Sequence, residues 1–486
     1  MIYKLRPYQE ECVKSISDYI NSDRHDPVLI VGPVGCGKSL LIAEAARLMG
    51  DKTLILQPSK ELLQQNHDKI TSYGIPATIY SASCGKKELS NMIYATLGSI
   101  KKVVDKLKEM GIRNVLIDEA HAGYSPEDGS EFMTFMNELK PKKVIGFTAT
   151  PCRLKNMSIG QTSYSQLNFI TRMRPVYFKN LIHVIQVEEM IRQGFWTPLK
   201  YETWDFNGDA LKLNSNGSEY TAESISEAVR KNGLNNLILR RLMVLKDVCR
   251  SILVFMDSVE SCNTAAEWMN AKICAGMAEV IHGGTPKKQR EAIVERFKSG
   301  GTRVVFNYSA LGTGFDHPGL DCVIVGRPTF SFSSFYQWLG RAVRIKDGKD
   351  SALVVDCCNN SSRFGDIREL SIENYKGYGW GMFIGDKLIT NIPMGDKVTK
   401  TDLDIKAAKK DRRRGLAQGV TAAPVPGRPD HPLGSTVMTF GKYCGWMLHS
   451  IPVSYFKFIN ETFDWDNDRN KDIKEYIDFL IKNNRL

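Results

Sequence analysis

The chain has 486 residues, of which 42% are hydrophobic and 24% are charged. This composition is typical of a soluble globular protein, and the length fits about three domains. No uninterrupted apolar run approaches the roughly 18 residues of a membrane span. The 11 cysteines are scattered without a CxxC pair, which excludes the usual signatures of a zinc site or a disulfide framework.

The net charge is +11 and the pI is near 9.0. Such a balance favours a polyanionic partner, because basic side chains bind phosphates and release counterions. A basic enzyme with no such partner would have the same charge, so the motifs must decide. The start, MIYKLRPYQEE, lacks the basic and then apolar order of a signal peptide, and we expect a cytoplasmic protein.

The first series of predicted elements begins at residue 28. Apolar runs alternate there with helix-like stretches, which is the pattern of a parallel β-sheet with crossover helices. This pattern predicts an α/β lobe over residues 1–197. We expect its strands at Val28–Val31, Thr53–Leu56, Ile93–Thr96, Val115–Ile117 and Val144–Phe147.

A second series of the same kind predicts another α/β lobe over residues 239–365. Residues 198–238 are less regular and are expected to connect the two lobes. The two series share an architecture without a short repeat, so we interpret them as two copies of one fold. The strands of the second series are expected at Ile252–Phe255, Glu279–Ile281, Val304–Phe306, Val323–Val325 and Leu353–Val355.

The carboxyl-terminal quarter has a different character. Residues 366–434 are predicted to be a basic, Pro/Gly-rich linker. Within it, Lys397–Arg414 carries eight basic and three acidic residues, a net charge of +5, which fits either a clamp on phosphates or a solvated charge run. Residues 435–486 are expected to form a small module, with a tight hairpin followed by helices. Its aromatic residues fit base stacking but are more typical of a small core; they include Phe440, Tyr443, Trp446, Tyr455 and Phe456.

A glycine-rich segment follows the first predicted strand directly and matches GxxxxGK[ST]. In such a loop the glycines let backbone N–H groups surround phosphates, and the next helix directs its positive end at them. Lys38 is expected to reach the β- and γ-phosphates of ATP and Ser39 to bind Mg²⁺. The nucleotide-binding residues predicted here are Gly32, Pro33, Val34, Gly35, Cys36, Gly37, Lys38 and Ser39.

Two carboxylates end another apolar strand of the same lobe, in the sequence Val115-Leu-Ile-Asp118-Glu119-Ala-His121. The ends of parallel strands are where open α/β sheets assemble ligand sites. Asp118 is therefore a candidate Mg²⁺ ligand, and Glu119 a candidate for polarising the attacking water. A strand-end Asp-Glu pair alone is more often structural, but the glycine-rich loop in the same lobe favours the catalytic interpretation.

The residues Asp118-Glu-Ala-His121 have the DEAH form of motif II of the superfamily 2 helicases, and the chain resembles that superfamily in the order of its other motifs. The resemblance covers about residues 3–356 and implies two RecA-like lobes of the P-loop NTPase fold, with ATP and Mg²⁺ bound between them. The other matching segments are Leu5–Gln9 (adenine-reading, with Arg6 and Gln9), Gln57–Leu63 (motif Ia), Gly146–Pro151 (III), Ile252–Phe255 (IV), Asn307–Asp316 (V) and Gln337–Arg344 (VI).

The motif VI segment is expected to be helical, with Gln337, Arg341 and Arg344 on one face because they recur at i, i+4 and i+7. Arginines placed in this way can neutralise charge on the γ-phosphate from the other lobe. A solvated basic face is the alternative. In motif V, Gly314 would allow close approach to a phosphate or ribose, and Asp316 would accept a hydrogen bond from a ribose hydroxyl, although a simple glycine-rich turn has the same residues.

Motif III contributes two threonines. Thr148 and Thr150 resemble the family's link between hydrolysis and strand movement, since their hydroxyls could bond to the surroundings of Asp118 and to the other lobe. A strand-to-loop turn without a catalytic part is the alternative.

Three segments point to a narrower group: the start Leu5–Gln9, the Gly-Phe-Thr-Ala-Thr-Pro form of Gly146–Pro151, and Phe178–Pro198, which ends in Arg-Gln-Gly-Phe-Trp-Thr-Pro. In these segments the chain is similar to phage and bacterial DNA repair and recombination helicases of the UvsW-like and RadD-like kinds, and to the motors of type I restriction enzymes. The resemblance implies a DNA helicase or translocase that remodels forked or branched DNA during replication, recombination or repair in a bacterial or phage-infected cell. The chain lacks the Cys-rich zinc module of RadD-like proteins. An RNA helicase and a nucleic-acid-stimulated ATPase subunit of a larger assembly are the alternatives. Besides DNA, a protein partner that binds through residues 435–486 is possible.

Overall fold

The computed structural model describes residues 4–50, 52–159, 162–311, 315–407, 431–439, 443–462, 465 and 470–486. The chain divides into two compact units. Unit 1 comprises Met1–Asn374 and Trp380–Val398, and unit 2 comprises Tyr375–Gly379 and Thr399–Leu486. Among the described residues, no helix is long and apolar enough to cross a membrane.

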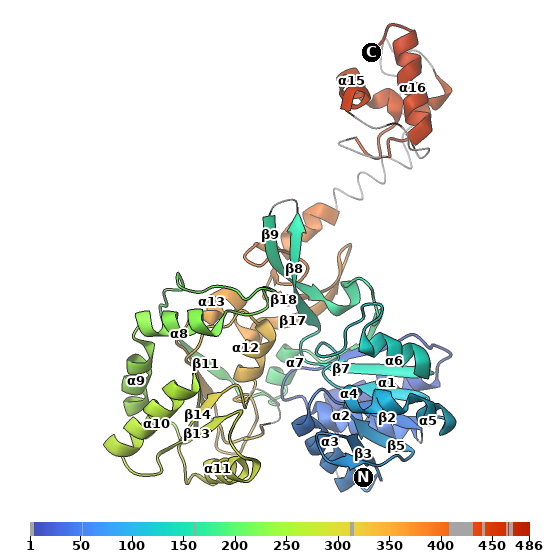
Figure 1. Cartoon of the computed structure of the whole chain (residues 1–486). Coiled ribbons are helices and arrows are strands. Elements are labelled where there is room, and N and C mark those ends of the chain that lie inside the picture. The colour runs from blue at the N-terminus through green and yellow to red at the C-terminus, as the bar shows by residue number, and fades with distance from the viewer. Residues whose placement is uncertain are drawn as a thin grey trace. The chain divides into compact units, whose positions relative to one another are not determined.

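The first lobe of unit 1 is built on an 8-stranded sheet in the order β10-β1-β7-β6-β2-β5-β3-β4, shown in blue to green in Figure 1. Its strands pair in parallel except β3 with β4, which is antiparallel. The strands are β1 (Val28–Val31), β2 (Thr53–Leu56), β3 (Thr78–Ser81), β4 (Lys86–Lys87), β5 (Met92–Ala95), β6 (Asn114–Ile117), β7 (Lys143–Thr148) and β10 (Asn180–Val184).

The helices of this lobe cover both faces of the sheet. The chain moves outward along the sheet from β1 to β3 and then returns from β5 to β7. Because crossovers between parallel strands are almost always right-handed, the outward and returning helices lie on opposite faces. The helices are α1 (Pro7–Asn21), α2 (Lys38–Met49), α3 (Lys60–Ser72), α4 (Leu97–Ile100), α5 (Val104–Glu109), α6 (Glu131–Leu139) and α7 (Val187–Arg192).

The second lobe has a 6-stranded sheet in the order β11-β16-β15-β12-β14-β13, in which every pair is parallel. Its strands are β11 (Leu199–Thr203), β12 (Ile252–Phe255), β13 (Ala278–His282), β14 (Val304–Tyr308), β15 (Cys322–Val325) and β16 (Ala352–Asp356). Its helices are α8 (Ala222–Lys231), α9 (Leu234–Val248), α10 (Val259–Lys272), α11 (Lys287–Ser299), α12 (Phe332–Leu339) and α13 (Asn360–Phe364). The two sheets confirm the α/β class, and each predicted strand has its counterpart among these elements.

Several strands were not anticipated from the sequence. The edge strand β11 lies in the range 198–238 that we expected to be a connector. At the edge of the first sheet, β10 is another strand that the sequence did not predict. Both carry partly exposed residues, because an edge strand is covered less than a central one. The hairpin of β8 (Cys152–Ile159) and β9 (Thr162–Phe169) follows motif III, and β17 (Leu370–Tyr375), β18 (Gly379–Ile384), β19 (Lys387–Leu388) and β20 (Val398–Thr399) occupy part of the expected linker.

Unit 2 contains the small carboxyl-terminal module. Val437 and Met447 form an antiparallel bridge, as expected of a hairpin, and α15 (Val453–Thr462) and α16 (Lys471–Lys482) follow. Phe456 is fully buried in the core of the module, whereas Trp446 is 42% exposed. Residues 408–430, which include the end of the basic segment, and Phe440 lie outside the described residues. The buried core comprises Met438, Leu448, Ile451, Phe456, Ile459, Ile473, Tyr476, Ile477 and Leu480.

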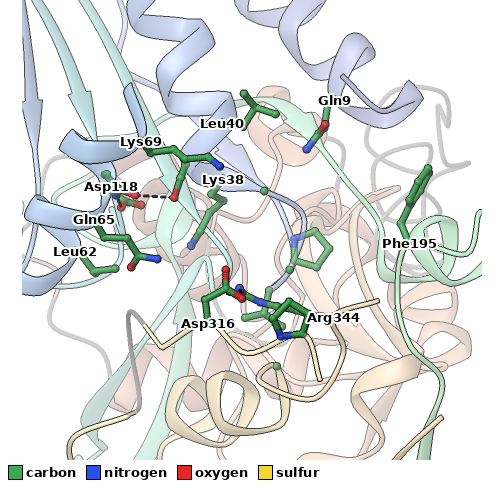
Figure 2. Close-up of a pocket in the computed structure, with 18 of the residues that line it drawn as sticks. Gln9, Lys38, Leu40, Leu62, Gln65, Lys69, Asp118, Phe195, Asp316 and Arg344 are labelled. Atoms are coloured by element: carbon green, nitrogen blue, oxygen red, sulfur yellow. Dashed lines mark hydrogen bonds and ion pairs between the residues drawn. The ribbon is translucent and has the colours of Figure 1, made fainter. Parts of the chain in front are cut away.

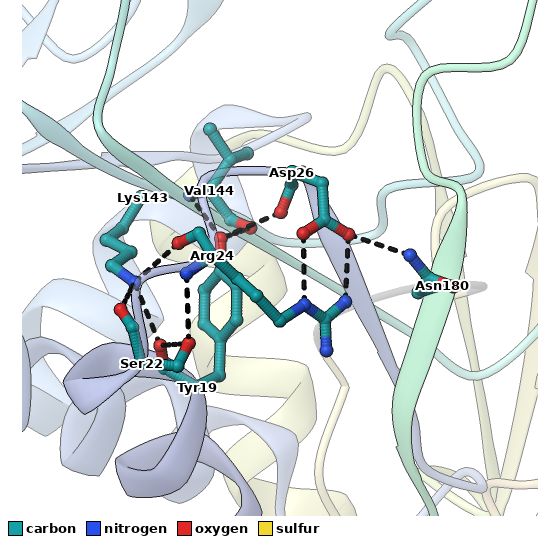
Figure 3. A network of polar contacts seen from close by, with 7 residues as sticks. All are labelled: Tyr19, Ser22, Arg24, Asp26, Lys143, Val144 and Asn180. Atoms are coloured by element: carbon teal, nitrogen blue, oxygen red, sulfur yellow. Dashed lines mark hydrogen bonds and ion pairs between the residues drawn. The ribbon is translucent and has the colours of Figure 1, made fainter.

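A buried lysine joins the start of β7 to the end of α1 (Figure 3). The ammonium of Lys143 donates hydrogen bonds to the carbonyls of Tyr19 at 2.9 Å, Ser22 at 2.7 Å and Arg24 at 2.6 Å. It also lies 4.7 Å from the centroid of the Tyr19 ring. The carboxyl end of a helix leaves carbonyls without partners and favours a cation. Lys143 therefore closes α1 and fixes the helix to the sheet.

We expect Lys143→Met to lower the free energy of unfolding of unit 1 by about 2–3 kcal/mol, because hydrogen bonds from a charged donor contribute about 1.5–3 kcal/mol. Urea denaturation followed by circular dichroism would measure this. Arg24→Ala is the matched control: Arg24 pairs with Asp26 at 2.8 Å in the same network, but its side chain is 45% exposed, and such pairs contribute under about 1 kcal/mol. Equal losses in the two variants would contradict the interpretation.

Candidate active site

A cavity of about 520 Å³ is lined by residues of both lobes. Figure 2 shows Gln9 and Phe195 on one side of it, Asp118 on the other, and Lys38 between them, with Asp316 and Arg344 contributed by the second lobe. Gly314 lies outside the described residues. The predicted site residues that line the cavity are Arg6, Gln9, Pro33, Val34, Gly35, Gly37, Lys38, Ser39, Asp118, Glu119, Asp316, Gln337, Arg341 and Arg344.

The glycine-rich loop joins β1 to α2. Gly35 and Gly37 have φ angles of 83° and 84°, in the left-handed region that only glycine adopts without strain. A Cβ on Gly37 would lie 2.6 Å from Nε2 of Gln9, which donates to the Cys36 carbonyl at 2.9 Å. Within the loop, Gly32 and Cys36 are buried. The loop is therefore a backbone cradle at the start of a helix, a geometry that suits phosphate.

Lys38 and Glu119 form an ion pair at the centre of the cavity, with 16% and 14% of their side-chain areas exposed. Burial opposes charge on both groups, but their mutual attraction outweighs it, so that the pKa of Lys38 is raised and that of Glu119 is lowered. Glu119 also has a φ of 46°, an uncommon conformation for a residue other than glycine. Such outliers gather at functional sites.

Asp118 accepts two hydrogen bonds, from the Glu119 backbone N–H at 2.9 Å and from the Asn66 amide at 2.9 Å. Burial, together with the negative charge of Glu119, raises the pKa of Asp118 to about 6. Ser39 donates to the Asn66 side-chain oxygen at 2.6 Å. The oxygens of Ser39 and Asp118 are thus held near each other, and oxygen donors of this kind fit Mg²⁺.

Motif III connects the site to the second lobe. The Thr148 hydroxyl lies 2.8 Å from Nδ1 of His121, and the Thr150 hydroxyl lies 3.1 Å from that of Ser333, a residue of α12. Ser333 also lies 3.3 Å from Nε2 of His121. Burial lowers the pKa of His121 to about 4, so this histidine is neutral at pH 7. The two threonines have the contacts that the sequence led us to expect.

The geometry of motif VI differs from the prediction. α12 ends at Leu339, so Arg341 and Arg344 follow the helix and do not lie on its face with Gln337. A Cβ on Gly340 would lie 2.5 Å from the Val34 side chain, and this close approach places the turn directly against the glycine-rich loop. Both arginines still line the cavity, and burial lowers their pKa to about 10, which leaves them cationic at pH 7.

The turn after α12 is held through its carbonyls. Lys349 donates to the carbonyls of Ala342 at 2.7 Å and Arg344 at 2.8 Å, and also to that of Pro318 at 3.2 Å. The Thr197 hydroxyl donates to the Arg344 carbonyl as well, at 2.7 Å. The carbonyls of Ala342 and Arg344 thus accept hydrogen bonds from side chains and not from the next turn of a helix. These bonds stabilise the turn and account for the early end of α12. Asp316, expected at a ribose, is paired here with the Arg344 guanidinium.

Three consecutive residues before β11 contact three parts of the cavity. Phe195 packs edge-on against Tyr8 at 5.3 Å between ring centroids, the Trp196 indole donates to the Val34 carbonyl at 2.7 Å, and the Thr197 N–H donates to the Val343 carbonyl at 2.7 Å. From the sequence this segment was noted only as part of a family resemblance, and its three residues, Asn66 and Lys349 were not predicted to belong to the site. The signal in the sequence that could have indicated a buried contact was the aromatic pair Phe195-Trp196 just before the edge strand β11.

Comparison with known proteins gives two family matches. Residues 2–153 match the type III restriction enzyme res subunit, and residues 235–346 match the helicase conserved C-terminal domain. A 51.5 kDa protein of a Lactococcus phage is 24% identical over 332 residues, which are 68% of this chain and 65% of that protein. The Saccharomyces cerevisiae protein named "Putative ATP-dependent helicase IRC3" is 24% identical over 57% of this chain and 38% of its own length.

Among solved structures, the ATP-dependent type ISP restriction-modification enzyme LlaBIII bound to DNA is similar with a TM-score of 0.53. The match has 15% sequence identity and covers 85% of this chain and 30% of that one. At this identity the likeness shows the fold alone. The matched region spans less than two thirds of the length of each of these three proteins.

We expect Glu119→Gln to lower ATP turnover by about 10²–10⁴-fold, the usual effect of removing a general base, while nucleotide affinity stays equal or rises because Lys38 is released from its ion pair. Phosphate release and binding of a non-hydrolysable ATP analogue would measure the two quantities. Lys38→Ala is the comparison and should lose both. If Glu119→Gln lost affinity as strongly as turnover, the assigned role would be wrong.

A second prediction concerns the turn after α12 that carries Arg341 and Arg344, the arginine turn. Lys349→Met should lower kcat by about 10²-fold, since a shift of about 1 Å in a charge-stabilising group has effects of that size. Nucleotide affinity should change much less, because the hydrogen bonds that the structure describes for Lys349 all go to backbone carbonyls. Lys346→Met, an exposed lysine in the same loop, is the control. Similar kcat values for both variants would refute the positioning role.

Proposed function

The chain belongs to superfamily 2, the ATP-dependent helicases, and from this premise we propose that it is a motor that couples ATP hydrolysis to movement along DNA and remodels forked or branched DNA. The observation that carries the proposal is the cavity itself. It combines the glycine-rich loop and the DEAH carboxylates of one lobe with the arginines of the other. A site divided in this way can respond to nucleotide by changing the contact between the lobes.

The proposed arrangement places the base of ATP beside Arg6, Gln9 and Phe195 and its phosphates over the glycine-rich loop. Ser39 and Asp118 would hold Mg²⁺. The metal, when bound, would neutralise charge on the β- and γ-phosphates. The backbone cradle and the two oxygen donors fit these groups.

In the proposed reaction the γ-phosphate takes the place of Glu119 beside Lys38. The Glu119 carboxylate then accepts a proton from the water that attacks the γ-phosphorus, and the bond to the β-phosphate oxygen breaks to leave ADP and phosphate. Arg341 and Arg344 stabilise the negative charge that develops on the transferred group. This change would reach the second lobe through hydrogen bonds. His121 contacts Thr148 in the first lobe, and both His121 and Thr150 contact Ser333 in the second.

Support for DNA comes from the net charge of +11 and from the names of similar proteins, which include a restriction-modification enzyme bound to DNA. We extend the proposal to replication, recombination or repair in a bacterial or phage-infected cell, with the phage relative as support. The exposed Trp446 and Phe458 support a role of residues 435–486 in binding a protein partner.

The test is steady-state ATPase activity of the full chain with single-stranded DNA, duplex DNA, a four-way junction or RNA, with Lys38→Ala subtracted as background. We expect strong stimulation by DNA, greatest with the junction. Stimulation by RNA alone would replace the DNA assignment with an RNA helicase. Turnover indifferent to every nucleic acid would favour an ATPase subunit of a larger assembly.

A further inference from the structure

Asn66 lies on α3 between the two residues proposed to hold Mg²⁺. Its side-chain oxygen accepts from the Ser39 hydroxyl at 2.6 Å, and its amide nitrogen donates to Oδ2 of Asp118 at 2.9 Å and to Oε1 of Gln57 at 3.1 Å. Asn66 is only 3% exposed. A buried amide is usually satisfied by backbone groups, whereas the partners of Asn66 are side chains from three separate parts of the lobe.

The direction of these hydrogen bonds is determined by chemistry. An ionised carboxylate can only accept hydrogen bonds, so the nitrogen of the Asn66 amide, and not its oxygen, must face Asp118. The Asn66 oxygen must then face Ser39, and because a carbonyl oxygen can only accept, the Ser39 hydroxyl is the donor. The proton of Ser39 therefore points at Asn66.

This orientation has a consequence for metal binding. A serine hydroxyl binds Mg²⁺ through an oxygen lone pair, and its proton must point away from the metal. We propose that Asn66 is a positioning residue of the Mg²⁺ site, which holds the proton of Ser39 away from the metal and fixes one oxygen of Asp118. Groups that orient metal ligands in this way contribute strongly to affinity, and their removal typically lowers metal affinity by 10–100-fold.

The inference rests on the metal ligands of the proposed function but not on its nucleic acid. It also gives Gln57 a part, because that residue begins motif Ia directly after β2 and accepts a hydrogen bond from the same amide. Mg²⁺ demands near-ideal octahedral geometry, so a ligand that rotates freely binds it poorly. Asn66 removes this freedom from Ser39 and Asp118 together.

The test measures binding of a fluorescent, non-hydrolysable ATP analogue to the full chain as Mg²⁺ is titrated, and again in EDTA. Asn66→Leu keeps the branched shape and removes both polar groups. We expect it to raise the Mg²⁺ concentration at the midpoint by about 10–100-fold and to leave binding in EDTA within about 2-fold. Gln64→Ala, on the same helix with a hydrogen bond only to Asp68 among those described, should behave as wild type.

A double-mutant cycle with Ser39→Ala tests the route of the effect. If Asn66 acts through the Ser39 hydroxyl, the effect of Asn66→Leu on the midpoint should shrink when that hydroxyl is absent. Thermal unfolding shows whether each variant is folded, and Asn66→Ala, which also removes the acceptor for Ser39, takes the place of Asn66→Leu in the cycle if the latter does not fold.

Three results would overturn the inference: a midpoint within about 2-fold of wild type, an equal loss of binding in EDTA, or fully additive effects in the cycle. Binding by the wild-type chain that does not depend on Mg²⁺ would also overturn it. Failure of the proposed function is distinguishable, because the ATPase would then ignore DNA while the Mg²⁺ titrations still separated Asn66→Leu from Gln64→Ala.

Discussion

A lysine ammonium is buried at the junction of the two lobes, and Glu119 is the group that neutralises it. A buried charge without a partner is very unfavourable, so the Lys38–Glu119 pair is stable until another anion reaches the loop. The neighbours fit this demand. His121 is held neutral, Asp118 has a raised pKa, and the Asn66 amide supplies a hydrogen bond to the second carboxylate. The centre of the site is thus the Lys38 ammonium, which pairs with Glu119 and could pair with a phosphate in its place.

Parallel sheets make this concentration of charge possible. The carboxyl ends of β1, β6 and β7 lie at one edge of the first sheet, where they carry the glycine-rich loop, the DEAH residues and motif III. In the second lobe the turn after α12 meets the same edge through Gly340, whose missing side chain allows contact with Val34. The fold therefore brings together groups that are separated by some 300 residues of sequence, and the chemistry follows from that proximity.

The sequence was informative wherever a residue's role is encoded locally. Central strands such as β6 are fully buried and appear as continuous apolar runs, and a glycine-rich loop between a strand and a helix has a characteristic spacing. Edge strands such as β10 and β11 lack that signal because one side faces solvent. Asn66 and Lys349 were missed for a different reason: their partners are distant in sequence, and an amide or lysine on a helix or loop is usually solvated. The early end of α12 also depends on tertiary contacts, which helical spacing does not contain.

The contacts of residues 195–197 have a consequence for how this architecture can be divided. Where the chain passes from one lobe to the other, it supplies an aromatic wall beside Tyr8, a hydrogen bond to the glycine-rich loop and a hydrogen bond to the arginine turn. A chimaera that exchanged a lobe with a relative at this point would separate groups that belong to one site. The natural module is accordingly both lobes with their junction, and recombination or engineering that preserves function has to keep Phe195, Trp196 and Thr197 with both partners they join.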